Sequence, residues 1–114
     1  MMNRTDRAER TMQALYGTAH APLERTDPEF AAIKERLIYG EVYAEERLSA
    51  KLRELVILVV AVTNQTMNEV RRHAAAALAA GVGPEEIKEA VYHCAPDIGL
   101  GKAENAVAAV NEVF

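Results

Sequence analysis

An acidic residue and a histidine form the most informative chemical pattern in this sequence. Glu69 and His73 are four residues apart in a segment with helical periodicity, so their side chains are expected on one face and within contact. A carboxylate beside an imidazole favours the protonated ring, which makes His73 a candidate proton donor or acceptor. A purely structural interpretation stays open, in which Glu69 completes a helix cap and His73 is a hydrogen-bonded core or interface residue.

Two further residues extend this pattern. Thr66 lies on the same helical stripe, because positions 66, 69 and 73 follow the spacing i, i+3 and i+7. Glu54 lies in the preceding apolar segment, flanked by aliphatic residues. Burying an ionised carboxylate is costly unless the charge is paired, so an inward-pointing Glu54 needs a partner. Alternatively, Glu54 lies at the solvated end of its helix beside Arg53.

Thiol and metal chemistry have weaker support. Cys94 is the only cysteine, so an internal disulfide is excluded. His93 precedes it directly, and adjacent helical residues point about 100° apart, which places His93 badly for activating the thiol. A buried, inert cysteine is the favoured interpretation, and a one-cysteine peroxidase or a disulfide between subunits is the alternative. The three histidines lie on separate segments, and Gly99 to Gly101 lacks a nucleotide-loop context, so we predict no metal and no cofactor.

The elements that position these residues are predicted to be helices throughout. Half of the residues are hydrophobic and only 5% are aromatic, which favours helices packed through small and aliphatic side chains. Residues 49–64 contain no Gly or Pro and exceed the length of a usual strand, so we predict a buried helix there. Further helices are predicted over residues 4–16, 28–43, 66–80, 84–95 and 102–114, with a linker at residues 21–25. The helical spacing of apolar residues extends to Phe114, so we expect that the last helix could continue for another turn.

Several residues predict where these helices begin and end. Thr26 and Thr66 are each followed by a Glu three residues later, the pattern of an N-terminal capping box. Gly17 and Gly81 are predicted to end helices. The expected fold is a compact all-α bundle of about six helices in one domain over residues 1–114, with its core in residues 49–114.

The charge pattern limits the classes of partner that the chain is expected to bind. A formal net charge of -4 and interleaved acidic and basic residues give no electrostatic footprint for nucleic acid or an anionic membrane. The N-terminal residues are charged where a secretory signal would be apolar, and the longest apolar stretch is too short to span a bilayer, so we expect a cytoplasmic protein. The helix from Ser49 is hydrophobic all round, which predicts a homo-oligomer that covers it.

The pattern from Leu52 to Gly83 resembles the core of the carboxymuconolactone decarboxylase family. The carrying motifs are Leu-Arg-Glu-Leu-Val-Ile-Leu-Val-Val-Ala-Val, then Glu-Val-Arg-Arg-His and Ala-Ala-Ala-Ala-Leu-Ala-Ala-Gly-Val-Gly. The segment from Pro84 to Ala106 continues the likeness, which covers about two-thirds of the chain. The resemblance implies an alkylhydroperoxidase D-like helical fold and a hexamer built as a trimer of dimers.

Alkylhydroperoxidase D relatives carry a Glu, a Cys-x-x-Cys pair and a His at the spacing that Glu54, Thr66, Glu69 and His73 show here. Thr66 and Glu69 occupy the two cysteine positions. A dithiol peroxidase needs one thiolate to attack the peroxide and a second thiol to resolve the sulfenic acid, and neither residue can do this. That mechanism is excluded at the usual site, and the chain resembles the decarboxylase-like branch.

The resemblance implies cofactor-free decarboxylation of a small lactone acid. His73 would be the proton donor, Glu54 or Glu69 would orient and charge it, and Arg72 and Thr66 would bind substrate, with Arg71 as the other candidate carboxylate clamp. Two alternatives stay open. One is an antioxidant peroxidase of the peroxiredoxin type that uses Cys94, and the other is a non-catalytic oligomeric ligand-binding protein in which the Glu54 and His73 cluster only holds an interface together.

Overall fold

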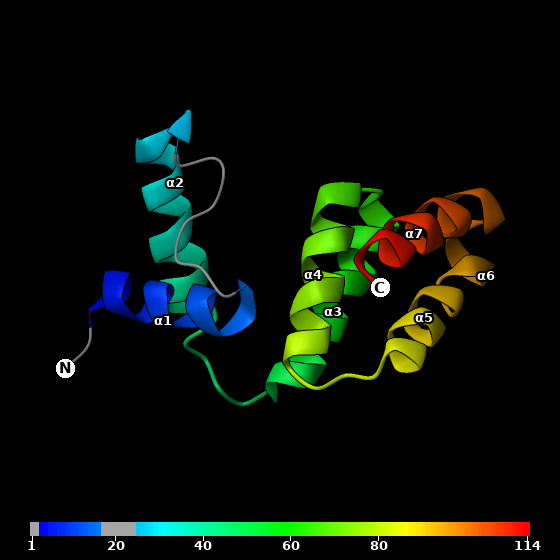
Figure 1. Ribbon diagram of the computed structural model, residues 1–114, viewed down its shortest axis with the longest axis horizontal. Helices are drawn as coiled ribbons and strands as arrows, with labels where there is room; N and C mark the ends of the chain where they lie inside the picture. The colour runs from blue at the N-terminus through cyan, green and yellow to red at the C-terminus, as the bar shows by residue number, and fades with distance from the viewer. Residues whose placement is uncertain (1–2, 17–24) are drawn as a thin grey trace. The chain divides into compact units, whose positions relative to one another are not determined.

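The computed structural model describes residues 3–16 and 25–114, which form helices joined by short turns (Figure 1). Within these residues there is no strand, so the all-helical prediction is confirmed. The described chain falls into two compact units, Met1–Arg47 and Leu48–Phe114. The prediction of one domain over residues 1–114 stays a prediction. His20, the expected helix end at Gly17 and nearly all of the expected linker at 21–25 lie outside the described residues.

The first unit contains α1 (Arg4–Tyr16), α2 (Pro28–Lys34) and η2 (Glu35–Val42). The predicted helix over residues 28–43 is present, but its second half is a π-helix, in which Tyr43 N–H donates to the Ile38 carbonyl five residues earlier at 2.8 Å. The predicted cap at Thr26 is wrong. Asp27 is the N-cap residue, because its carbonyl accepts the first helical hydrogen bond, from Ala31.

Helix α1 packs closely on η2. A Cβ atom at Gly40 would overlap the carbonyl group of Arg4, so the contact requires glycine. Arg7 Nε donates to the Gly40 carbonyl at 2.6 Å, which ties the two helices together at the same point. The rings of Tyr39 and Tyr43 meet edge to face, with centroids 5.1 Å apart. Backbone approach and aromatic packing together hold this unit.

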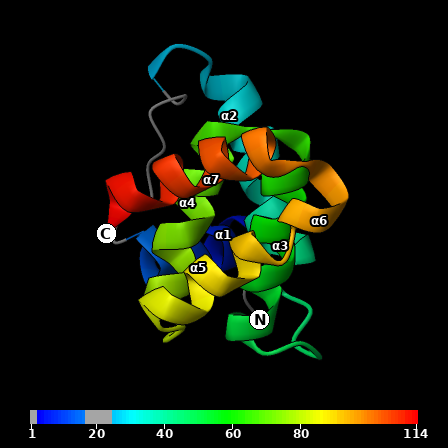
Figure 2. The same cartoon turned by 90° about the vertical axis from the view of Figure 1, so that its right-hand side faces the viewer.

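The second unit holds all of the predicted chemical residues. Its helices are α3 (Ala50–Asn64), α4 (Met67–Ala79), α5 (Pro84–Tyr92), α6 (Ala95–Ile98) and α7 (Leu100–Val113). Helices α3 and α4 form an antiparallel hairpin through Gln65 and Thr66 (Figure 1). Helices α5, α6 and α7 lie on the side of this hairpin that faces the viewer in Figure 2. The last helix begins two residues earlier than the predicted Lys102.

Local signals in the sequence account for most helix ends in this unit. The Ser49 hydroxyl accepts from Leu52 N–H at 3.2 Å and caps α3. Helix α4 ends in a Schellman motif, in which Val82 N–H donates to the Ala77 carbonyl while Gly81 has a φ of 98°. Glu86 accepts from Gly83 N–H at 3.0 Å and fixes the start of α5.

The prediction that the Thr66 side chain caps α4 is wrong. Thr66 is the N-cap residue of α4, but its side chain caps nothing. Its hydroxyl donates instead to the Ala61 carbonyl at 3.3 Å, at the end of α3. The hydroxyl therefore satisfies the last turn of the preceding helix rather than the first turn of its own.

Small and aliphatic side chains form the core of the second unit. Each of its long helices contributes at least one fully buried residue, and the central members are Leu58, Val62, Val70, Ala74, Ala77, Ile87, Val91, Ala106 and Val110. Burial of apolar area at about 25 cal/mol per Å² is the main stabilising term in such a core. The pairing of α3 with α4 in this core sets the positions of Glu54 and His73.

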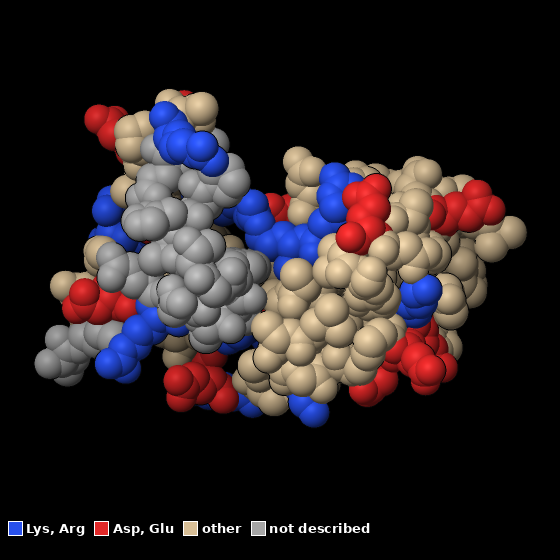
Figure 3. Space-filling model, viewed as in Figure 1, with Lys and Arg blue, Asp and Glu red and all other residues tan. Residues whose placement is uncertain are grey.

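Charged and uncharged side chains separate on the face of the second unit seen in Figure 3. Acidic and basic groups lie next to each other in the upper part of this face. Arg71 on α4 pairs with Glu112 near the C-terminal end of α7 at 3.1 Å. An uncharged surface lies below them in this view. No helix among residues 3–16 and 25–114 is both long and apolar enough to cross a membrane.

Candidate active site

Glu54 and His73 meet inside the α3 and α4 hairpin. His73 Nδ1 lies 2.8 Å from Glu54 Oε1, and both side chains are buried, Glu54 completely. Glu54 is on the inward face of α3, one turn before Leu58, and His73 is on the inward face of α4. The antiparallel pairing of the two helices brings these residues together although 19 positions separate them. The predicted partner of the buried carboxylate is therefore His73.

Arg53 also pairs with Glu54, and sequence reasoning did not include it among the site residues. Its Nε lies 3.0 Å from Glu54 Oε2, so each oxygen of the buried carboxylate has a charged or polar partner. Neighbouring residues on a helix do not face each other, but the long arginine side chain curls back far enough to make this contact. The sequence signal was the adjacency of Arg53 to Glu54, which we interpreted only as a solvated helix end. Burial of Glu54 excludes that interpretation.

Glu69 and Arg72 form the outer part of the cluster. Glu69 Oε2 lies 3.2 Å from His73 Nε2, and Glu69 Oε1 lies 3.0 Å from Arg72 Nη1. The Glu69 side chain is 38% exposed, whereas the His73 side chain is 6% exposed. Glu69 is therefore the group through which the buried imidazole borders solvent. The predicted contact of Glu69 with His73 across one helical turn is present.

The arrangement constrains the number of protons in the cluster. A neutral imidazole carries one N–H, yet both ring nitrogens of His73 lie within hydrogen-bond distance of a carboxylate oxygen. Two hydrogen bonds require two protons. Either the ring is an imidazolium between Glu54 and Glu69, or a neutral ring accepts a proton shared with one carboxyl group. The cluster therefore places both ring nitrogens of His73 against a carboxylate oxygen, which is the geometry that proton transfer between these groups requires.

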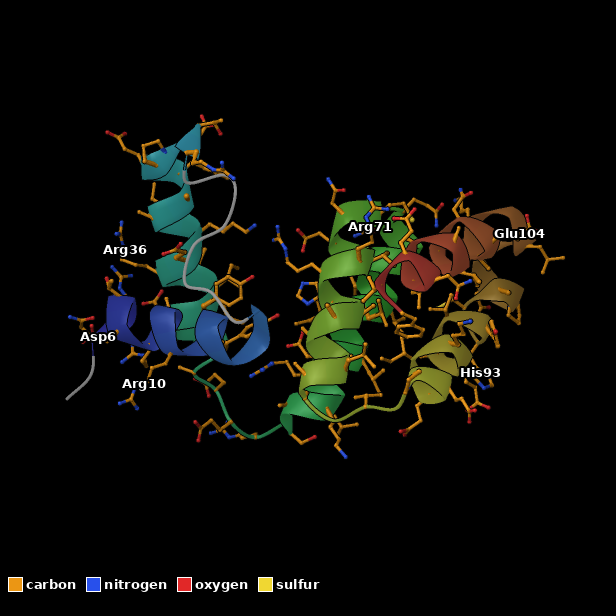
Figure 4. All side chains as sticks on the ribbon, viewed as in Figure 1. Asp6, Arg10, Arg36, Arg71, His93 and Glu104 are labelled. Carbon is orange, nitrogen blue, oxygen red and sulfur yellow. The ribbon has the colours of Figure 1, made fainter. Side chains whose placement is uncertain are left out.

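Other predicted site residues lie outside this cluster. The exposed Thr66 uses its hydroxyl on the Ala61 carbonyl, and the described structure gives it no hydrogen bond to Glu69 or His73. Arg71 pairs with Glu112 and Asn68 on the surface, so of the two predicted carboxylate clamps it is Arg72 that contacts Glu69. Figure 4 shows Arg71 on α4, well apart from His93 beside α5.

Cys94 is separate from the cluster and poorly suited to nucleophilic chemistry. The thiol is buried and donates to the Ala90 carbonyl at 3.4 Å. Burial raises the pKa of the Cys94 thiol, and the negative charge of Asp97 raises it further. His93, the neighbouring residue in sequence, is exposed. These observations favour the inert interpretation of the cysteine.

The carboxylates of the cluster do not converge on a metal position. Glu54 and Glu69 contact opposite nitrogens of the His73 ring. Within the described residues, no three His, Cys, Asp or Glu side chains are arranged to hold a metal ion. A separate apolar groove of about 560 Å³ lies beside α7, bordered by Tyr92, Leu100 and Val107. It contains no member of the cluster, so we assign no chemistry to it.

The fold and the site together define a class of protein: a small helical protein with a buried Glu and His pair between two antiparallel helices. The family model described as "Carboxymuconolactone decarboxylase family" matches residues 28–112, and this chain belongs to that family. The match includes the whole of the Glu54, Glu69, Arg72 and His73 cluster. The resemblance that the sequence motifs indicated is confirmed.

A relative from Acinetobacter baylyi carries the name 4-carboxymuconolactone decarboxylase. It is 31% identical to this chain over 86 residues, which make up 75% of this chain. The matched region spans 64% of the length of that relative. The name 4-carboxymuconolactone decarboxylase therefore belongs to a protein that is longer than the region matched by this chain.

Proposed function

We propose that the chain is a cofactor-free decarboxylase of a small unsaturated lactone acid such as 4-carboxymuconolactone. The observation that carries the proposal is the buried contact of 2.8 Å between His73 Nδ1 and Glu54 Oε1. Glu54 fixes the orientation of the imidazole through this contact. Nε2 is then the ring nitrogen that faces the half-exposed side of the cluster. Membership of the family and the name of the relative support the same reaction class.

The reaction needs only what this cluster offers. The bond between the ring carbon and the departing carboxylate breaks, and its electron pair passes into the conjugated lactone carbonyl as CO2 leaves. A proton from His73 Nε2 then forms the new C–H bond, and the imidazole regains a proton from solvent through Glu69. Proton transfer by a positioned side chain contributes about 10²- to 10⁴-fold to a rate. Arg72 supplies a positive charge for a substrate carboxylate.

The activity is tested with the purified chain and 4-carboxymuconolactone. We expect release of one CO2 for each lactone acid consumed, with no added metal or cofactor. Muconolactone, which lacks the departing carboxyl group, is the matched control and is expected to persist unchanged. No CO2 release from 4-carboxymuconolactone at any protein concentration would contradict the proposal. The alternative of a ligand-binding protein predicts that same absence of turnover together with saturable binding.

We also propose that the chain acts as a homo-oligomer. Leu52, Val56 and Val60 recur every four residues along α3, and they are 54%, 55% and 53% exposed. Identical apolar stripes on two copies can cover each other around a two-fold axis, because such an interface is self-complementary. Covering the stripe would remove a row of aliphatic side chains from water. The hexamer implied by the family resemblance stays a prediction.

A further inference from the structure

Glu69 is bound by its own helix in the way that proteins bind a free carboxylate. Each of its two oxygens lies beside a separate nitrogen, Arg72 Nη1 at 3.0 Å and His73 Nε2 at 3.2 Å, and Nε2 donates to the carboxylate when the ring carries a proton there. One donor per oxygen is the arrangement that charge-assisted recognition of carboxylates uses. Glu69 also lies in the first turn of α4, where the positive end of the helix favours a negative charge. The surroundings of this carboxylate therefore form an anion site that is already filled.

The Glu69 side chain is held less firmly than the His73 ring that it contacts. The His73 side chain is 6% exposed and anchored by Glu54, so one donor is fixed in place. The Glu69 side chain is 38% exposed and can rotate into solvent without burying a charge. An exposed ion pair gains little net free energy, since each partner is also well solvated when apart. A carboxylate from solution can therefore compete with Glu69 for the same two donors.

We propose that Arg72 and His73 Nε2 form a binding site for a small carboxylate anion, and that Glu69 is its built-in occupant in the free protein. An entering carboxylate pairs with Arg72 and turns Glu69 outward. This displacement uncovers His73 Nε2 beside the bound molecule. The role of this site for substrate rests on the proposed decarboxylase function, whereas the binding of an anion does not.

Competition by a tethered group has a measurable consequence. The apparent affinity of a site is reduced by the fraction of time that the site is open. If Glu69 occupies the site for about nine-tenths of the time, removing its charge strengthens anion binding about tenfold. The surface pair of Arg71 on α4 with Glu112 on α7, at 3.1 Å, offers a matched control, because it has an arginine and a glutamate but no histidine.

The test titrates sodium formate into the wild-type chain, Glu69→Ala and Glu112→Ala, with calorimetry for affinity and imidazole ¹⁵N resonances for location. We expect Glu69→Ala to bind formate about tenfold more tightly than wild type and to shift the Nε2 resonance of His73. Glu112→Ala should match wild type, and the double variant Glu69→Ala with Arg72→Gln should lose the gain. Glu69→Gln, which keeps the side-chain length, replaces Glu69→Ala if the latter fails to fold.

Two outcomes would overturn this inference. One is equal formate affinity in folded Glu69→Ala, or folded Glu69→Gln, and wild type. The other is an equal gain in Glu112→Ala, which would show that any exposed arginine suffices. Formate binding needs no turnover, so its failure is distinct from failure of the proposed decarboxylation. Conversely, a chain that binds formate as expected but releases no CO2 retains the anion site and loses the proposed function.

Discussion

His73 Nδ1 and Glu54 Oε1 are 2.8 Å apart in the buried interior of the α3 and α4 hairpin, and Arg53 completes the pairing of the carboxylate. A buried charge with its partners in place is tolerated, but removing one partner leaves the other uncompensated. The Glu54 and His73 contact therefore connects the stability of the hairpin to the orientation of the imidazole. The predictions below separate these two consequences.

Substitution of Glu54 tests the structural side of this contact. In Glu54→Gln the amide keeps its shape but loses its charge, so Arg53 and His73 lose a charged partner. We expect the free energy of unfolding to fall by about 1–3 kcal/mol, measured by urea denaturation. Glu104→Gln on the exposed face of α7 is the control and should unfold like wild type. An unchanged unfolding midpoint for Glu54→Gln would show that the pair contributes no stability.

The two glycines Gly81 and Gly101 should respond to alanine in opposite directions. Gly81 has a φ of 98° and a Cβ there would lie 3.0 Å from Lys51 Cε, so Gly81→Ala is expected to lower the free energy of unfolding by about 1–2 kcal/mol. Gly101 is helical with open space around it, so Gly101→Ala should raise that free energy by up to about 1 kcal/mol. Thermal or urea unfolding measures both. The same sign for the two variants would contradict the assigned backbone geometry.

The helices of the second unit were largely predictable, because local chemistry decides their ends. Ser49 as a cap and Gly81 as a left-handed terminator both act within a few residues of their own position. The cap at Thr66 was mispredicted because its hydroxyl had a competing acceptor, the Ala61 carbonyl, which only the tight α3 and α4 turn brings near. The π-helical half of the helix after Pro28 had no local signal either, since it lies where η2 meets α1 at Gly40.

The candidate site was predictable where one helix carries both partners. Glu69 and His73 follow from i, i+4 spacing alone. The contact of His73 with Glu54 needed the pairing of two helices, and only the cost of burying a carboxylate pointed to it. Arg53 was missed because adjacency on a helix argues against contact. The contact of Arg72 with Glu69 follows from i, i+3 spacing, whereas the pairing of Arg71 with Glu112 on α7 has no local pattern.

The Cys94 thiol should resist alkylation in the native chain. Its pKa is raised, first by burial and then by Asp97, so little thiolate forms near neutral pH. We expect iodoacetamide to label Cys94 only in denaturant, as measured by intact mass. Rapid labelling of the native chain would return thiol chemistry to consideration.

The same raised pKa has a consequence for stability. As pH rises past the ordinary value of 9.0, the unfolded thiol loses its proton while the folded thiol keeps it. The unfolded state is then favoured, so the free energy of unfolding falls as pH rises. From about pH 8 to about pH 10, wild type should lose more stability than Cys94→Ala, which lacks the thiol. Parallel pH profiles for the two proteins would be inconsistent with a shifted pKa.

The apolar stripe of α3 gives the test of assembly. Val56→Asp places a charge in the middle of the row formed by Leu52, Val56 and Val60, and an unpaired charge in an apolar interface is strongly unfavourable. We expect light scattering to report an oligomer for wild type and a smaller species for Val56→Asp. Glu89→Asp, on the exposed surface of α5, is the control and should assemble like wild type. A stable wild-type monomer would defeat the proposal.

The decisive measurement is the rate of decarboxylation by His73→Gln, compared with wild type and with His93→Gln as the matched exposed histidine. We expect His73→Gln to remain folded and assembled while its kcat falls by about 10²- to 10⁴-fold, and His93→Gln to retain the wild-type kcat. A folded His73→Gln protein that turns over lactone acid at the wild-type rate would contradict the assignment of this imidazole as the proton donor.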